Sequence, residues 1–352
     1  MSKPSISFIL PKRPEESVEK TIDLVVKSCK ENRIRFEIIV SQGNHPTFQR
    51  NDSVVHAKLD YIYFIDNDSE VSSQSIKALI DFLVAQEKKS MAVDAIGGPT
   101  VLIPQATPIM KNIDAVLSSR LAVGKVAARY SAIGEIRESD EGELILCNLV
   151  VRHSAFKGLK SFEKKLYPGE EVDFIMRLLR EKKKVFYHPQ VVVKRPQRSS
   201  FKDFIRQMYL YGVGRAELTR INFKNFSFLF LLPAFLMAVF FLAGVTVFFF
   251  YGPVAFISYL AFFPLVYFLY TLAIVIDAKR RKRSFSIGIF LCTFICHFFF
   301  PLGILAGFTY SGMAADKKKI SYNIVCLTGK TLTSRALIKK FLAKLSKPKA
   351  RV

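Results

Sequence analysis

The chain has few acidic residues and few cysteines for its length. Only 29 of its 352 residues are Asp or Glu, against 52 Lys or Arg, so the formal net charge is +23. The five cysteines are scattered and odd in number, which argues against a disulfide framework and indicates a reducing compartment. The opening MSKPSISFILPKRPEE lacks the basic start and long apolar core of a signal peptide, so we expect the N-terminal domain not to be exported.

Hydrophobic and charged residues are segregated along the chain. Residues 1–226 lack any long apolar run and have the mixed composition of a globular domain, whereas residues 227–310 are largely uncharged. Within that region, 227–250 and 253–276 are each long enough to cross a hydrocarbon layer of roughly 30 Å. The Tyr-Gly-Pro turn between them predicts a helical hairpin.

The charge after this hairpin predicts its orientation. DAKRRKR follows at 277–283, and the positive-inside rule places it, with the N-terminal domain, in the cytoplasm. A third apolar segment, 287–310, contains Pro301 and Gly303 and either spans or re-enters the membrane; we favour re-entry, which keeps the basic tail inside. That tail, 311–352, holds eleven Lys or Arg and predicts a segment on anionic lipid, in preference to a nucleic-acid ligand. We expect an integral protein of a bacterial inner membrane.

The first 90 residues alternate between strand and helix patterns. Segments rich in β-branched and aromatic residues predict strands at 5–10, 35–40 and 61–65. Helical periodicity predicts helices around 15–30, 49–58 and 75–85. This order predicts an α/β fold with a doubly wound, mostly parallel sheet, in which ligands bind at the carboxyl ends of the strands.

Two acids directly follow the third of these strands. YIYFI is succeeded by Asp66, Asn67 and Asp68, and two anions at this spacing repel unless a positive group or water lies between them. One interpretation is a loop in which an Asp caps the next helix. The other is a divalent-metal site, which the position at the sheet edge favours.

A second acidic cluster lies in LYPGEEVDFIMRLLR. Pro168-Gly169 breaks the chain, and Glu170, Glu171 and Asp173 then fall in the first turn of a predicted helix that ends in basic residues. Acids first and bases last complement the helix dipole, so a purely structural helix and an active-site helix are both open at this point.

Taken in order, these features resemble the family 2 glycosyltransferases with a GT-A fold over roughly residues 5–215. The likeness rests on SISFILPKRPEE, on Arg50-Asn51 before a strand ending in Asp-x-Asp, on Asn148 and Arg152 in CNLVVR, on GEEVDFIMRLL, and on the C-terminal apolar helices. The resemblance implies a Rossmann-like catalytic domain at 1–226 and inverting sugar transfer.

The resemblance also implies roles for single residues. Glu171 would be the catalytic base, and Asp68, with Asp66, would hold Mg²⁺ or Mn²⁺ against the leaving diphosphate. Arg50 would contact the donor, unless it is a surface helix cation. The other implied donor-side residues are Pro11, Glu15, Asp66, Asn67, Arg206, Gln207 and Arg215. The implied acceptor-side residues are Glu170, Asp173, Gly98 and Asn148.

Two further absences refine the expected activity. The chain contains no tryptophan and so lacks the Gln-x-x-Arg-Trp signature of processive polysaccharide synthases, which favours transfer of a single sugar. The second strand ends in Ser41-Gln42-Gly43, where the family usually has an acid pair that reads the nucleobase. The base of the donor is therefore not assigned.

We expect a membrane-anchored, metal-dependent, inverting glycosyltransferase. It would move one sugar from a nucleotide-sugar donor to a lipid-linked or cell-envelope glycan acceptor. A GT-A-like nucleotide-binding or scaffold protein without catalysis is the alternative. A transporter is disfavoured because His297 is the one ionisable residue within the predicted spans.

Overall fold

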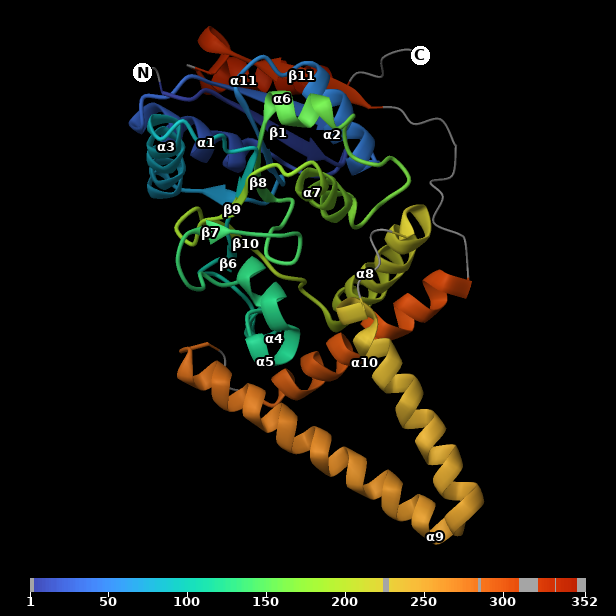
Figure 1. Ribbon diagram of the computed structural model, residues 1–352. Helices are drawn as coiled ribbons and strands as arrows, with labels where there is room; N and C mark the ends of the chain where they lie inside the picture. Colours follow the sequence, from blue (N-terminus) through green and yellow to red (C-terminus); the bar gives the residue numbers. More distant parts are fainter. Residues whose placement is uncertain (1–2, 224–227, 284–285, 310–321, 333, 347–352) are drawn as a thin grey trace. The chain divides into compact units, whose positions relative to one another are not determined.

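The computed structural model describes residues 3–223, 228–283, 286–309, 322–332 and 334–346 (Figure 1). The chain divides into two compact units. Unit 1 comprises residues 1–103, 128–195 and 315–352, and unit 2 comprises residues 104–127 and 196–314. The expected membrane region, 227–310, falls wholly within unit 2.

Unit 1 is built around a mixed eight-stranded sheet in the order β11-β2-β1-β3-β8-β5-β9-β7. Its strands are β1 (Ile6–Lys12), β2 (Phe36–Gln42), β3 (Tyr61–Ile65), β5 (Ala95–Gly97), β7 (Arg137–Glu138), β8 (Asn148–Arg152), β9 (Val185–Tyr187) and β11 (Asn323–Leu327). A small second sheet has the order β4-β10-β6, with β4 (Glu70–Val71), β6 (Thr100–Leu102) and β10 (Val193–Arg195).

The predicted parallel core is present, but the whole sheet is less parallel than expected. β1 pairs in parallel with both β2 and β3. β8 then runs antiparallel between β3 and β5, and β11 and β7 add antiparallel edges. The expected α/β class is confirmed, as a mixed sheet.

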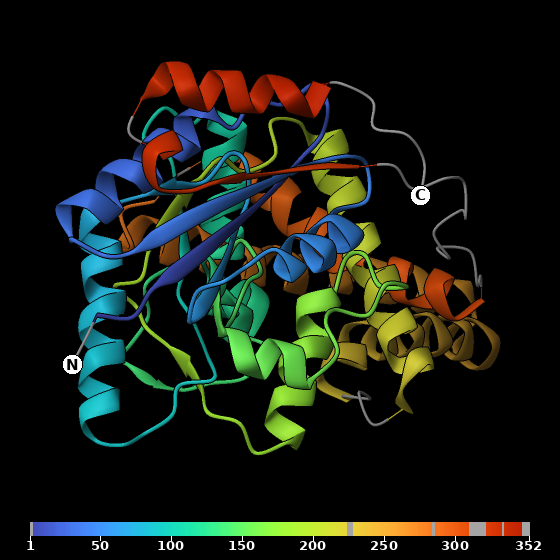
Figure 2. The same cartoon turned by 90° about the horizontal axis from the view of Figure 1, so that it is seen from above.

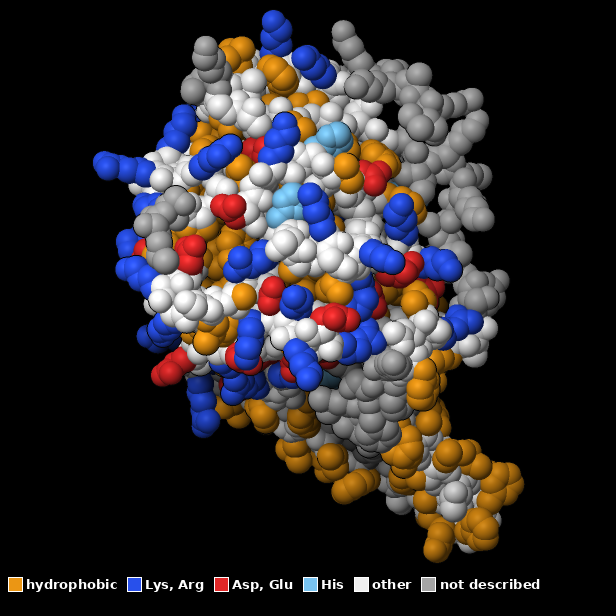
Figure 3. All heavy atoms as spheres, turned by 45° about the horizontal axis from the view of Figure 1, so that its top comes forward, with side chains coloured by type: hydrophobic (Ala, Val, Ile, Leu, Met, Phe, Trp, Pro, Cys, Tyr) orange, Lys and Arg blue, Asp and Glu red, His pale blue; other side chains and the backbone are white. Residues whose placement is uncertain are grey.

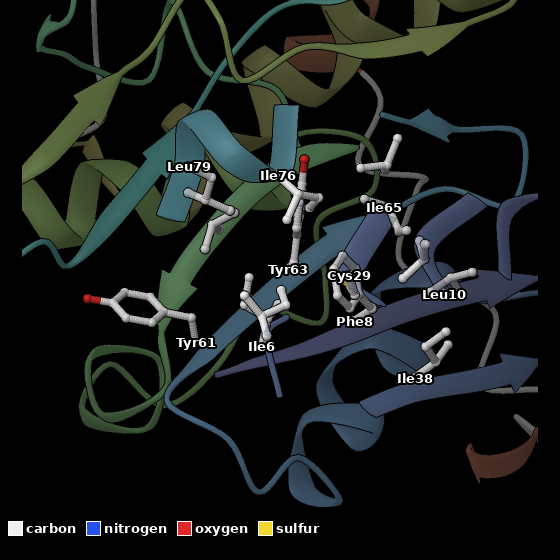
Figure 4. Packing of buried hydrophobic residues seen from close by; sticks show 14 of the residues in the cluster. Ile6, Phe8, Leu10, Cys29, Ile38, Tyr61, Tyr63, Ile65, Ile76 and Leu79 are labelled. Atoms are coloured by element: carbon white, nitrogen blue, oxygen red, sulfur yellow. The ribbon is translucent and has the colours of Figure 1, made fainter. Parts of the chain in front are cut away.

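Helices cover both faces of the large sheet. Those of unit 1 are α1 (Glu19–Glu31), α2 (Pro46–Val55), α3 (Ser73–Lys88), α6 (His153–Gly158), α7 (Glu170–Arg180) and α11 (Arg335–Leu342). Side chains alternate along each strand. Phe8 and Tyr63 therefore pack in the cluster that includes Cys29 of α1 and Ile76 of α3 (Figure 4), whereas Ile9 and Phe64 belong to the core on the opposite face. Burial on both faces explains why β1 and β3 read as continuous apolar runs.

The C-terminal segment belongs to this core. β11 pairs with β2 from Asn323↔Gln42 to Leu327↔Ile38, and α11 follows it beside the sheet (Figure 2). Leu327 and Ile338 are buried in the same cluster as Phe8. The structure thus corrects the expected membrane-surface tail for residues 322–332 and 334–346, whose apolar side chains pack on the sheet. Residues 311–321, 333 and 347–352 of that tail lie outside the described residues.

Unit 2 is helical. It contains α4 (Pro108–Leu117), α5 (Arg120–Val123), α8 (Phe201–Ile221), α9 (Phe228–Arg280) and α10 (Gly288–Thr309). Gly252, with φ of 78°, interrupts α9 and separates two arms that fold back in a V (Figure 1). Both α9, over Ala238–Arg280, and α10 are long and apolar enough to cross a membrane.

We predict that the C-terminal segment stabilises unit 1. Leu327→Ala should lower the free energy of unfolding by about 2–5 kcal/mol, because it leaves a cavity beside β2. Leu337→Ala, at a 37% exposed site on α11, should change it by less than about 0.5 kcal/mol. Denaturant unfolding of the full chain in detergent measures both. If both variants lower the free energy of unfolding by the same small amount, Leu327 does not contribute to the core and the prediction is wrong.

Candidate active site

A tight turn at the end of β3 presents the first acid pair. Asp66 follows Ile65 directly, its backbone N–H donates to Ser69 Oγ at 3.2 Å, and its carbonyl accepts from Ser69 N at 3.1 Å. The chain then enters β4 at Glu70. Asp66 and Asp68 therefore lie where the sequence predicted, at the carboxyl edge of the parallel strands.

The positive group between these two acids is Arg195. Its Nε donates to Asp68 Oδ1 at 3.0 Å, and its Nη2 lies 3.1 Å from Asp66 Oδ2. β10 brings it there, because β10 pairs with β4 with Lys194 opposite Glu70. Burial raises the pKa of Asp68, although the Arg195 guanidinium opposes this.

A second guanidinium joins Asp66 to the helix that carries the other acids. Arg50, on α2, donates to Asp66 Oδ1 and to Glu170 Oε1, both at 2.9 Å. Thr47, one turn earlier, donates to Glu170 Oε1 at 3.3 Å. The Arg50 side chain is 7% exposed, so the surface-cation interpretation of Arg50 is wrong. Burial raises the pKa of Glu170 to about 7, against the opposing effect of Arg50.

The three acids in the first turn of α7 have different cationic partners. Gly169 precedes the helix with φ of 114°, a conformation that favours glycine. Glu171 is 12% exposed and its Oε1 lies 3.8 Å from Arg129 Nη1. Asp173 instead bonds to Arg177 Nε at 2.7 Å, one turn along the same helix. Asp173 thus pairs within its own helix, whereas Glu171 faces a cation from another segment.

Two expected acceptor-side residues make structural contacts. Asn148 is fully buried, accepts from Tyr63 Oη at 2.7 Å and donates to the carbonyls of Pro99 and Val191. A Cβ atom on Gly98 would lie 2.0 Å from the Val191 carbonyl oxygen, so no larger residue fits there. Both residues pack against the Val191 carbonyl, in the loop between β9 and β10.

The remaining predicted residues are dispersed. Pro11 is buried in β1, Glu15 is exposed in the following loop, and the Asn67 carbonyl accepts from Thr21 Oγ1 at 2.7 Å. Arg206, Gln207 and Arg215 lie on α8 in unit 2. Their donor-binding roles stay predictions.

Comparison with known proteins identifies the family. A sequence model of the protein family described as glycosyl transferase family group 2 matches residues 61–276, more than half of the chain. The chain belongs to this family. It is a glycosyltransferase, as the resemblance in the sequence implied.

Individual relatives of this glycosyltransferase are distant. A dolichyl N-acetyl-α-D-glucosaminyl phosphate 3-β-D-2,3-diacetamido-2,3-dideoxy-β-D-glucuronosyltransferase from Methanococcus voltae is 20% identical over 309 residues, 83% of this chain and 84% of the relative. The mannosyltransferase PcManGT from Pyrobaculum calidifontis, solved with GDP-Man and Mn²⁺, is 9% identical over 89% of both chains, with a TM-score of 0.48. S. aureus TarS 1–349 is 14% identical over 61% of this chain and 65% of its own, with a TM-score of 0.37.

The acid pair of this glycosyltransferase fits a divalent cation on one condition. Carboxylate oxygens are the ligands that Mg²⁺ and Mn²⁺ prefer, and Mg²⁺ is often held by one or two carboxylates plus substrate phosphates. Three of the four oxygens of Asp66 and Asp68 bond to guanidinium groups. Among the described residues, no group of three or more acid, His or Cys side chains could hold a metal ion. The pair fits a cation once Arg195 releases it.

Sequence reasoning missed Arg195, Arg129 and Thr47. Arg129 ends a short 3-10 helix (Gly124–Arg129) in a stretch with no motif, and its guanidinium donates to the carbonyls of Gly142 and Glu141. Thr47 lies three residues before Arg50, a helical spacing that places both on one face, and this signal was available. Arg195 ends a short strand whose partners are distant in sequence, so no local pattern marks it.

We predict that Arg50 and Glu170 are energetically coupled. Arg50→Met should destabilise the protein by about 3–5 kcal/mol, because it leaves Glu170 buried without its cation. Adding Glu170→Gln should restore part of that loss, since the uncompensated charge is then gone. Thermal unfolding of both single variants and the double variant measures the coupling. Additive losses would show that the ion pair contributes nothing.

Proposed function

We propose that this glycosyltransferase transfers one sugar from a nucleotide-sugar donor to a lipid-linked or cell-envelope glycan acceptor, with inversion. The proposal depends mainly on one observation: Arg50 links the acid pair at the end of β3 to the acidic start of α7. This brings the sheet edge where ligands bind and a candidate base into one charged site.

The donor diphosphate would bind at the edge formed by Asp66, Asp68 and Arg195. Guanidinium groups bind phosphate oxygens bidentately, and the Arg195 side chain is 27% exposed, so a ligand can reach it. Asp66 and Asp68 would hold Mg²⁺ or Mn²⁺, whose charge would stabilise the leaving diphosphate.

Glu171 would act as the base. The acceptor hydroxyl gives its proton to the Glu171 carboxylate and its oxygen attacks the anomeric carbon, while the bond from that carbon to the diphosphate breaks and the nucleoside diphosphate leaves. Attack from the face opposite the leaving group inverts the configuration. Glu170 and Arg50 would hold the start of α7 in position for this step.

An acceptor in the membrane is supported by the surface of unit 2. Large apolar side chains at the hairpin turn of α9 are exposed, including Phe249, Phe250, Tyr251 and Val254, each at 74% or more. Figure 3 shows hydrophobic side chains covering the end of this hairpin. Such a surface favours lipid over water. The Methanococcus voltae relative is named for a dolichyl phosphate-linked sugar.

Chain connectivity constrains the membrane crossings. β2 and β11 are hydrogen-bonded in one sheet, so residues 36–42 and 323–327 lie on the same side of any membrane. The chain between them must therefore cross an even number of times. If the two arms of α9 cross, α10 returns to the side from which it entered.

Contacts within unit 2 support re-entry by α10. A Cβ on Gly303 would lie 2.1 Å from the Tyr209 carbonyl of α8, so the two helices are in close contact. Arg220 of α8 donates to the Gly307 carbonyl near the end of α10 at 3.0 Å. A charged side chain at this end favours a position at the membrane–water interface.

We predict that Glu171→Gln lowers kcat for sugar transfer by about 10²–10⁴-fold, because the amide cannot accept the acceptor proton. Donor binding, measured by calorimetry, should be unchanged. Glu181→Gln, exposed at the other end of α7, is the control and should keep full activity. Unimpaired transfer by Glu171→Gln would exclude Glu171 as the base.

We predict opposite membrane sides for the two ends of the second α9 arm. In a Cys326→Ser background, which removes the exposed cysteine of the described chain, Gly252→Cys should be labelled by an impermeant maleimide from the side opposite unit 1. Lys282→Cys should be labelled from the side of unit 1, as should Glu15→Cys. Labelling of Gly252→Cys and Glu15→Cys from one side would contradict the hairpin.

A further inference from the structure

Backbone pairing fixes Arg195 beside the acid pair from both sides. β10 lies between β4 and β6, with Val193 opposite Val71 on one side and opposite Thr100 on the other. The Arg195 carbonyl also accepts from Ile103 N at 3.3 Å. Arg195 is thus held in the sheet that begins at the turn carrying Asp68, and its position does not depend on a mobile loop.

The guanidinium of Arg195 is fully engaged. Nε and Nη2 contact Asp68 and Asp66, and Nη1 donates to Cys147 Sγ at 3.3 Å. Cys147 is buried immediately before β8, so this third contact directs the planar group across both carboxylates. A planar fork that bridges two acids is a geometry that lysine cannot reproduce.

Charge balance at this edge follows from that geometry. The two negative charges of Asp66 and Asp68 face Arg195, which contacts both, and Arg50, which Asp66 shares with Glu170. A divalent cation would require the same oxygens that Arg195 contacts. Like charges at that distance repel, so the cation and the guanidinium cannot both occupy the pair.

We propose that Arg195 is an internal counter-cation that competes with a divalent metal ion for Asp66 and Asp68 and thereby sets the metal affinity of the site. The inference deepens the proposed function, because it assumes that this edge is where the donor binds. Before the donor binds, Arg195 holds the two carboxylates in place and offsets part of their negative charge. The edge then presents less negative charge to an incoming diphosphate than the two carboxylates alone would.

The test is a Mn²⁺ titration of the full chain in detergent, without donor, followed by electron paramagnetic resonance of free Mn²⁺. Arg195→Ala should bind Mn²⁺ at least about tenfold more tightly than the unchanged protein. This factor is expected if Arg195 contacts both acids in about 90% of the unchanged molecules. Lys194→Ala is the matched control. It removes an adjacent, exposed cation that forms no ion pair with Asp66 or Asp68 in the described part of the chain, and it should leave the affinity unchanged.

Two more variants define the result. Asp68→Asn in the Arg195→Ala background should abolish the gain, which assigns it to the acid pair. Arg195→Lys should also tighten binding, by less, and it serves if the alanine variant does not fold. Equal Mn²⁺ affinity in the unchanged protein and in the folded Arg195 variant would overturn the proposal. The titration contains no donor, so its result does not depend on sugar transfer. A protein that fails to transfer sugar would contradict the proposed function and not this inference.

Discussion

Carboxylates at the edge of the large sheet are stable only because guanidinium groups reach them from distant parts of the chain. Arg50 contacts Asp66 after β3 and Glu170 at the start of α7, and it is almost wholly buried. Removing one partner of a buried pair costs about 3–5 kcal/mol, more than most single contacts contribute. The position of α7, and with it that of Glu171, therefore depends on the charge of the acid pair. One side chain, Arg50, thus connects the proposed donor site to the helix that carries the proposed base.

The sequence located these acids well because their signals are local. A buried strand that ends in Asp-x-Asp and a Pro-Gly break before three acids are each visible within about ten residues. The first lies at the expected edge, and the second opens the expected helix. The role of Arg195 could not be read in the same way. It depends on β10 pairing with β4 and β6, segments about 90 to 120 residues away in the chain. Strand pairing over such separations is decided by packing, and no pattern within the strand encodes it.

The C-terminal segment shows a different limit of sequence reasoning. An amphipathic basic helix has the same periodicity whether its apolar face meets lipid or a protein core. Here Ile338 is buried, while Arg335 and Lys339 face outward and approach Asp23 and Glu19 of α1. The composition of the segment correctly indicated a polar face and an apolar face. It could not indicate whether lipid or the protein core would cover the apolar face. In the structure, the core cluster that contains Phe8 covers it.

That strand also changes how the apolar helices are connected to unit 1. With β11 paired to β2, the apolar helices are an insertion whose two ends both return to one folded unit, so the catalytic sheet is tied to unit 2 by chain on both sides. A single linker would let the sheet reorient freely, whereas several links restrict the orientations available to it. The proposed transfer to an acceptor in a lipid layer would require that the proposed donor edge face that layer, and a restricted orientation would raise the fraction of encounters that are productive. The C-terminal strand thus contributes to stability and to the geometry of the proposed reaction through the same hydrogen bonds.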